Sequence, residues 1–481
     1  MPDLVPDLVP DPGPVGMDAE EFRHLGHELI DWIADYHQRV GSLPVRSTVE
    51  PGWVRQQLPA RPPERGEPLT TLTDELDRVI VPGLTHWQHP SFFGFFPANA
   101  SYPSILGELV SAGLGVQGMT WSTSPACTEL EALVLDWLVD LCDLPARFRS
   151  DGPGGGVIQG SASEATLCAI VAARARAGGA AEQRRLVGYV SAQAHSSADK
   201  GFAIAGFAPE QLRHVPVDEH YALDVAALVE MIDQDRAAGL VPFFVMATVG
   251  TTSTTAIDPV KAMADVAAAA GAWLHVDAAY AGAAAVCPEL RWVNAGLDRA
   301  DSYLFNPHKW LLVNFDCDAF YVADRQPLLD ALSILPEYLR SAAAPDGRAA
   351  VDYRDWQVPL GRRFRALKLW LTLRAYGAEG LAAHVRRHVA LAQDFARAVA
   401  ADPRFEVVAP HPLGLVCFRL VDGDDANQRL LDALNDSGRI YLTPTRLDGR
   451  LVLRLAVGGT WTEDRHVTEA WTLISELAGG R

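Results

Sequence analysis

The sequence lacks long hydrophobic runs. No apolar stretch approaches the roughly 18 residues that a helix needs to span a bilayer. The first residues also lack the basic segment and short apolar core of a secretory signal. These absences predict a soluble, cytoplasmic protein without a membrane partner.

Positive charge is scarce as well. The chain has 41 Lys and Arg against 60 Asp and Glu, which gives a formal net charge of -19 at pH 7. Such an excess of negative charge repels nucleic acid and anionic membrane surfaces. We therefore expect no nucleic-acid partner.

Cysteine pairs with metal-binding or redox spacing are missing. The six cysteines are dispersed, lie mostly in apolar surroundings and form no CxxC motif. This pattern favours reduced core residues over disulfides or a zinc site, and we expect no metal. They are Cys127, Cys142, Cys168, Cys287, Cys317 and Cys417.

What the sequence does contain is a lysine in an apolar setting. Lys309 follows Asn306, Pro307 and His308 and stands between two apolar runs. Burying a lysine as a cation is costly, whereas a desolvated amine loses its proton more readily and can form a Schiff base with an aldehyde. A lysine extending to solvent from a strand end is the alternative.

A carboxylate precedes this lysine at the end of an earlier apolar run. The stretch from Gly271 to Val276 predicts a buried strand that ends at Asp277. A carboxylate against the ring nitrogen keeps pyridoxal phosphate protonated and makes the ring an electron sink. An Asp at a strand end can also be a turn residue or a helix cap.

Together these motifs resemble a known family. The sequences HVDAAY (275–280), NPHKW (306–310), SPACTELE (124–131) and PLGRRF (359–364) resemble those of the group II pyridoxal-phosphate decarboxylases, specifically the aromatic L-amino acid decarboxylases. The resemblance implies a fold type I architecture of the α/β class, with a mostly parallel doubly wound sheet in the large domain. It also implies pyridoxal 5'-phosphate as cofactor, an amino-acid substrate and a homodimer with shared active sites.

The same resemblance divides the chain into four parts. Residues 1–16 are rich in Pro and Asp and predict a disordered arm. Residues 17–100 correspond to an N-terminal helical dimerisation segment, and residues 101–375 to the large domain that binds the cofactor. Residues 376–481 correspond to a small C-terminal α+β domain.

Several further residues are expected to bind the cofactor. A glycine-rich strand leads into a helix at Ala162 and Ser163, and the free amides of a helix start suit a phosphate. An ordinary capped helix is the alternative. The resemblance places His195 flat on the cofactor ring, facing the substrate carboxylate. The remaining cofactor-binding residues that we expect are Thr248, Asp277, Ala279, Asn306, His308 and Lys309.

An aromatic loop at residues 85–98 predicts the wall of a substrate pocket, although it could also be a plug against the core. Phe95 and Ala98 stand where many animal relatives carry Tyr and Thr. Both changes remove hydroxyls that a hydroxylated ring could pair with. Gly361 resembles the glycine of plant tryptophan decarboxylases. The expected substrate-binding residues are Trp87, Phe95, Phe96, Pro97, Ala98, His195 and Gly361.

These features predict decarboxylation of L-tryptophan to tryptamine, with phenylalanine, tyrosine and DOPA left as alternative substrates. Tyr338 resembles the loop tyrosine that protonates the substrate carbon after carbon dioxide leaves. Relatives that make aldehydes by oxidative deamination carry Phe there. The expected catalytic residues are Lys309, Tyr338, His195 and Asp277. An aldehyde synthase and a non-enzymatic dimeric binding protein are the rival hypotheses.

Overall fold

The computed structural model describes residues 17–334 and 351–479. The chain divides into two compact units, Met1–His86 and Trp87–Arg481. The predicted arm at residues 1–16 lies outside the described residues. The division into four parts stays a prediction.

The first unit is helical. Its long helix α1 (Ala19–Arg39) begins after Asp18, whose carboxylate accepts hydrogen bonds from the amides of Glu20 and Glu21 at 2.9 Å each. Such an N-cap satisfies amides that have no partner within the helix. Two short helices follow, α2 (Trp53–Gln57) and α3 (Leu72–Glu75). The Trp32 indole of α1 donates to Asp77 at 3.1 Å, which ties α1 to the turn after α3.

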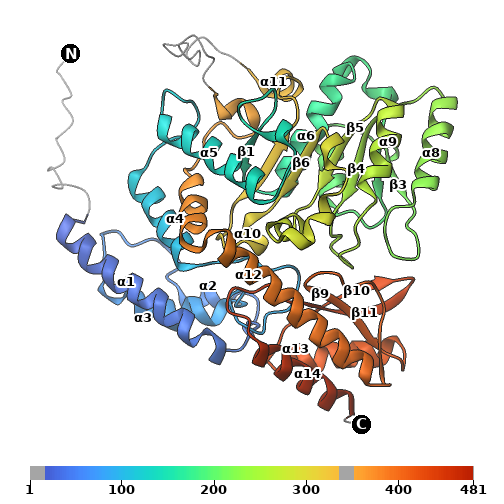
Figure 1. The fold of residues 1–481 in the computed structure, drawn as a ribbon. Coiled ribbons are helices and arrows are strands. Elements are labelled where there is room, and N and C mark those ends of the chain that lie inside the picture. Colours follow the sequence, from blue (N-terminus) through green and yellow to red (C-terminus); the bar gives the residue numbers. More distant parts are fainter. Residues whose placement is uncertain (1–16, 335–350, 480–481) are drawn as a thin grey trace, which may run out of the picture. The chain divides into compact units, whose positions relative to one another are not determined.

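A seven-stranded sheet organises the second unit (Figure 1). Its strand order is β1-β7-β6-β5-β4-β2-β3, and among these described strands β7 runs in the direction opposite to the other six. The strands are β1 (Gly155–Gln159), β2 (Leu186–Ser191), β3 (Leu212–Val215), β4 (Val241–Thr248), β5 (Trp273–Asp277), β6 (Ser302–Phe305) and β7 (Asp318–Val322).

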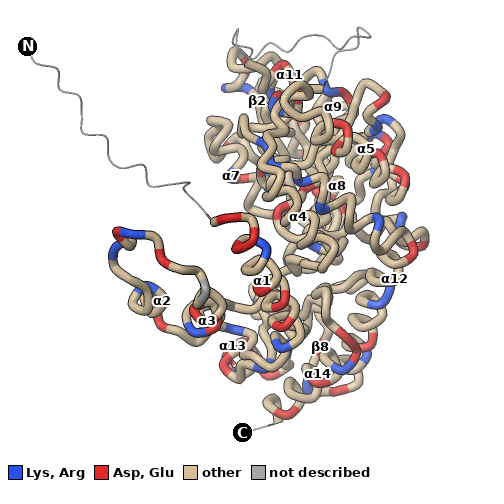
Figure 2. The backbone as a smooth tube through the Cα atoms, turned by 90° about the vertical axis from the view of Figure 1, so that its left-hand side faces the viewer, with Lys and Arg blue, Asp and Glu red and all other residues tan. Residues whose placement is uncertain are grey.

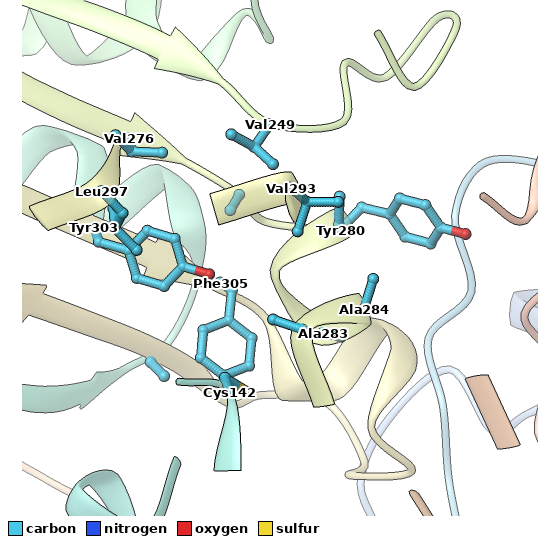
Figure 3. Packing of buried hydrophobic residues seen from close by; sticks show 14 of the residues in the cluster. Cys142, Val249, Val276, Tyr280, Ala283, Ala284, Val293, Leu297, Tyr303 and Phe305 are labelled. Atoms are coloured by element: carbon cyan, nitrogen blue, oxygen red, sulfur yellow. The ribbon is translucent and has the colours of Figure 1, made fainter. Parts of the chain in front are cut away.

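Helices cover both faces of this sheet, so its strands are apolar throughout rather than alternating. Leu274 and Val276 of β5 pack into a core shared with α5, α8 and α9, whereas Trp273 packs into the core on the α6 and α7 face. In Figure 3, Tyr303 and Phe305 lie in the first of these cores, while the ring of Tyr280 extends away from them. The helices are α4 (Tyr102–Leu114), α5 (Pro125–Leu141), α6 (Ala162–Arg176), α7 (Ser197–Ile204), α8 (Val225–Ala237), α9 (Val260–Ala270), α10 (Pro307–Trp310) and α11 (Gln326–Leu332).

A second, smaller sheet completes this unit. The long helix α12 (Ala366–Ala401) leads to β8 (Phe405–Val407), β9 (Leu415–Leu420), β10 (Thr443–Leu447) and β11 (Arg450–Ala456), which are all antiparallel. Asp448 and Gly449 join β10 to β11 with φ angles of 50° and 76°, the left-handed region that a tight hairpin turn needs. Helices α13 (Asp424–Asp436) and α14 (Asp464–Gly479) share its core. The predicted α/β fold with a small α+β part is thus confirmed.

No helix within residues 17–334 and 351–479 is long and apolar enough to cross a bilayer. Figure 2 shows acidic residues interspersed with basic ones along the chain. The cytoplasmic location expected from the sequence stays a prediction.

All six cysteines are buried and unpaired, which confirms them as core residues. Burial raises the pKa of Cys142, Cys168, Cys317 and Cys417 to about 12, so these groups remain thiols. A buried thiol of this kind packs like a small apolar side chain.

Two glycines of α4 give a matched test of its packing against α12. A Cβ on Gly107 would lie 2.5 Å from the Lys368 Cα, whereas one on Gly113 would meet nothing within 4 Å. We expect Gly107→Ala to lower the free energy of unfolding by about 1–3 kcal/mol because the helices must separate. Gly113→Ala should raise it by about 0.5–1 kcal/mol, since alanine loses less backbone entropy in a helix. Urea unfolding checks both, and a Gly107→Ala protein as stable as the parent contradicts the packing.

Candidate active site

Polar side chains gather at the carboxyl edge of the large sheet, where ligands bind in open α/β folds. Thr248 ends β4 and pairs in register with Asp277, which ends β5. Asp277 in turn pairs with Leu304 of β6, two residues before Asn306. The predicted strand ends thus lie side by side at one edge.

The loop after β5 fixes the Asp277 carboxylate. Asp277 is buried, and its Oδ1 accepts a hydrogen bond from the Ala279 amide at 2.9 Å. The Ala279 carbonyl accepts from the Asn306 amide at 3.0 Å. One chain of hydrogen bonds therefore links the acid to the segment that carries Lys309.

Lys309 lies in the one-turn helix α10 and is partly buried. Loss of hydration lowers the pKa of its amine, and the nearby Asp277, together with Asp318 when that acid is ionised, opposes this only in part. Its Nζ lies 5.8 Å from the centroid of the Phe96 ring. A lowered pKa increases the fraction of free amine, which is the form that attacks an aldehyde.

A stack of rings supports this lysine. Phe96 lies on Tyr280 with 3.9 Å between centroids, and Tyr280 lies on Trp310 at 4.7 Å. The Trp310 indole donates to His388 Nδ1 of α12 at 3.0 Å, and burial holds the pKa of His388 far below its usual value. The stack holds the residue next to Lys309 in place without adding a charge.

His308 is neutral for the same reason. It is buried, and desolvation together with the adjacent Lys309 lowers its pKa to about 3. Its Nδ1 accepts a hydrogen bond from the Cys317 amide at 3.0 Å. The ring therefore fastens α10 to the approach of β7.

His195 lies in the turn between β2 and α7 and is exposed. Its Nδ1 accepts a hydrogen bond from the Ser197 amide at 3.1 Å. In the neutral ring the proton must then be on Nε2. This leaves an N–H donor at the sheet edge for a bound group.

The donor set at this edge fits an aldehyde cofactor with a phosphate. Thr248 Oγ1, Asn306 Oδ1 and Ser197 Oγ are buried, and none has a hydrogen-bond partner in the described structure. Buried polar atoms are rarely left unpaired, so these three suit the polar groups of a ligand. The start of α6 adds the amides of Ala162 and Ser163, which precede the first hydrogen bonds of that helix.

The aromatic loop divides between two roles. Phe92, Phe93 and Phe96 are buried, as the alternative of a core plug requires. Trp87 and Phe95 are 39% and 46% exposed and stack at 5.5 Å between centroids. The loop is therefore partly a plug and partly an open aromatic surface.

The remaining expected substrate residues lie as follows. Pro97 packs against Gly458, where an added Cβ would lie 2.5 Å from the proline Cγ. The Ala98 carbonyl accepts a hydrogen bond from the side-chain amide of Gln88 at 2.5 Å. Gly361 is exposed beside Gln117, which would lie 3.3 Å from a Cβ there. Tyr338 lies outside the described residues.

The sequence interpretation missed one acid. Asp318 is completely buried at the start of β7, and its carboxyl acts on the pKa of Lys309. The available signal was an acidic residue directly before the apolar run of residues 319–322. The stacked Tyr280, Trp310 and His388 were also missed as supports of the site.

Comparison with known proteins agrees with this geometry. Residues 51–421 match the family model described as the pyridoxal-dependent decarboxylase conserved domain. Phenylacetaldehyde synthase of Arabidopsis thaliana is 48% identical over 96% of this chain and 96% of its own. Tryptophan decarboxylase 2 of Oryza sativa subsp. japonica is 45% identical over 96% of this chain and 95% of its own.

A solved structure shows the same likeness. The crystal structure of Catharanthus roseus tryptophan decarboxylase in complex with L-tryptophan superposes with a TM-score of 0.92. The two chains are 45% identical, and the match covers 96% of this chain and 98% of the other.

The scarcity of lysine makes the reactivity of Lys309 easy to test. The sequence has four lysines, of which Lys200 and Lys261 are exposed and Lys368 pairs with Glu108 at 2.8 Å. We expect one equivalent of pyridoxal phosphate, followed by borohydride reduction at neutral pH, to label Lys309 because its amine has the lowered pKa. Peptide mass mapping reads the position. Label on the exposed lysines with Lys309 unmodified contradicts the assignment.

Proposed function

This chain belongs to the pyridoxal-dependent decarboxylase family and is a pyridoxal-phosphate-dependent decarboxylase of aromatic L-amino acids, and we propose that its preferred substrate is L-tryptophan. The product would be tryptamine. The observation that carries the assignment is the Lys309 amine of lowered pKa, at the same sheet edge as the buried Asp277. The tryptophan decarboxylases among its relatives support the choice of substrate.

The residues of the sheet edge divide the work of holding the cofactor. Bound pyridoxal phosphate supplies an electron sink for the pair of electrons released with carbon dioxide. Lys309 would hold the aldehyde carbon, and Asp277 would keep the ring nitrogen protonated. Ala162 and Ser163 at the start of α6 would receive the phosphate. Asn306 and Ala279 line the site between Lys309 and Asp277.

Two other residues act on the substrate side. His195 offers its Nε2–H to the substrate carboxylate, and Thr248 offers the Oγ1 that has no partner within the described chain. These two residues would orient the substrate carboxylate for loss of carbon dioxide, and such orientation supplies a large part of a rate enhancement. His308, held neutral by burial, orients Lys309 through α10.

The fate of the substrate carbon separates two products. Tyr338 would return a proton to that carbon and release the amine. The likeness to phenylacetaldehyde synthase favours a second candidate, an aldehyde synthase that consumes oxygen and releases ammonia and hydrogen peroxide. Tyr338 in this sequence favours the amine, since aldehyde-forming relatives carry Phe there.

The selectivity proposal depends on the loop at residues 85–98. Phe95 and Ala98 bring no hydroxyl to the pocket wall. A phenol or catechol buried there would lack a partner, and an unpaired buried hydroxyl costs about 1–3 kcal/mol. An indole has one N–H donor and no acceptor, so it leaves fewer polar positions unpaired than a phenol or a catechol.

A product assay with tryptophan, phenylalanine, tyrosine and DOPA tests this function. We expect tryptamine to form fastest, without hydrogen peroxide. The double variant Phe95→Tyr and Ala98→Thr should raise the rate with DOPA relative to tryptophan about tenfold, the equivalent of one hydrogen bond of about 1.4 kcal/mol. Phe22→Tyr, on the exposed side of α1, is the matched control.

Three outcomes contradict parts of the proposal. Tyramine outpacing tryptamine would refute the hydroxyl argument. Peroxide in step with product would establish the aldehyde synthase, and bound cofactor with no product from any amino acid would indicate a binding protein.

We also infer that the protein is a homodimer with shared active sites. Helix α4 presents an apolar stripe at helical spacing, and its members are 40–56% exposed. They are Tyr102, Leu106, Leu109, Val110 and Leu114. The single charged residue of α4, Glu108, pairs instead with Lys368 at 2.8 Å. A stripe of this kind in water marks an interaction surface.

The stripe lies close to the active-site segment. Ser101, the residue before α4, donates to the Leu312 carbonyl at 2.7 Å, and Ser104 Oγ accepts from the Asn314 amide at 2.7 Å. Leu312 comes three residues after Lys309. A partner that covers α4 would therefore stand beside the segment that carries the lysine.

Light scattering with size-exclusion chromatography tests the dimer. We expect the parent protein at twice the chain mass and the Leu106→Asp, Leu109→Asp variant at the mass of one chain, because two charges cannot be buried in an apolar contact. Val229→Asp, which changes an exposed residue of α8, should leave the dimer intact. A double variant that remains dimeric would show that another surface forms the contact.

A further inference from the structure

Asp318 is a second acid at the edge of the active site. It opens β7 and pairs in register with Gln159, the last residue of β1. Because β7 runs antiparallel to β1 and β6, its first residue lies at the same edge as the end of β5, where Asp277 stands. The Asp318 side chain is completely buried.

Neither carboxyl oxygen of Asp318 has a hydrogen-bond partner among the described residues. Other buried acids do have partners: Asp258 accepts two backbone amides and Asp235 pairs with Arg213. An ionised carboxylate without donors is costly to bury, whereas the protonated acid has only one O–H to satisfy.

A partner for that O–H lies across the strand pair. The side-chain carbonyl oxygen of Gln159 is buried without a donor in the described structure. Cβ atoms of directly paired residues lie about 4.5–5.5 Å apart, so an acid at Asp318 can reach it. The pair is complete only when Asp318 is protonated.

The charged groups around Asp318 favour the same state. Burial is the main cause that raises its pKa well above the usual value, and Asp277 and Glu164 raise it further against the opposing effect of Lys309. Two thiols, Cys168 of α6 and Cys317, complete these surroundings, and both remain neutral.

We propose that Asp318 is a positioning residue for Lys309: as an uncharged acid it withholds a counter-ion, so that the lysine remains the free amine that bonds the cofactor. A carboxylate at this place would favour the ammonium form, which has no lone pair for the aldehyde. The only bond that changes at Asp318 is its O–H, through exchange with solvent. This inference depends on the proposed role of Lys309.

Stability against pH tests the protonation state without cofactor. A pKa raised on folding gives stability that is present at low pH and lost as pH rises through the folded pKa. The melting temperature of cofactor-free Asp318→Asn, relative to that of the cofactor-free parent, should therefore increase steadily as pH rises above about 4. Asp235→Asn is the matched control, because the pKa of Asp235 is lowered and its stabilisation is lost as pH falls. A pH-independent difference for Asp318→Asn, or one with the trend of the control, overturns the proposal.

The effect on Lys309 is read from cofactor attachment, followed by visible absorbance after mixing apoprotein with pyridoxal phosphate. At mildly acidic pH, Asp318→Asn and the parent should attach the cofactor at equal rates. At pH values above the pKa of Asp318 and below that of Lys309, the parent should fall behind about tenfold for each unit by which the new carboxylate raises the pKa of Lys309. Equal profiles at every pH, or a faster variant already in mild acid, overturn the proposal. If Lys309→Ala retains a borohydride-reducible bond, the proposed site itself is wrong, which is a separate failure.

Discussion

The withdrawal of the Lys309 amine from water is the constraint on which the site depends. The centroid of the Phe96 ring lies 5.8 Å from the lysine nitrogen. This ring stacks on Tyr280, which stacks on Trp310, and Trp310 is held by His388 of helix α12. Fully buried aromatic rings exclude water and are expensive to displace. The fold therefore holds the lysine in a position that lowers the pKa of its amine.

The groups around that amine also add little charge. Asp277 is tied to the Ala279 amide, while His308 and His388 are kept neutral by burial. Electrostatic effects are strongest where water is excluded, so each neutral group matters as much as each charged one. The edge of the sheet thus presents one fixed acid, Asp277, toward a ligand, and the two histidines add no charge beside it.

Much of this site could be predicted from the sequence because its chemistry lies at strand ends. Thr248, Asp277 and Asn306 each follow an apolar run, and parallel strands bring such positions to one edge. Strand β7 begins only at Asp318, although an apolar run ends at Val313, because the residues between them bond to α4 and to His308. The environment of Asp318 could not be predicted, because it is set by pairing with Gln159, more than a hundred residues away in the chain.

The residues that support Lys309 could not be predicted from the sequence either, because His388 of α12 reaches Trp310 only through tertiary packing. Local patterns report on local structure, and long-range contacts override them. The same limit explains why relatives with different products resemble this chain so closely. A phenylacetaldehyde synthase and a tryptophan decarboxylase share 48% and 45% of its residues across nearly the whole length. An amine and an aldehyde product differ in whether the substrate carbon takes up a proton or is oxidised by oxygen, and a change of about 1.4 kcal/mol in either barrier shifts such a choice tenfold.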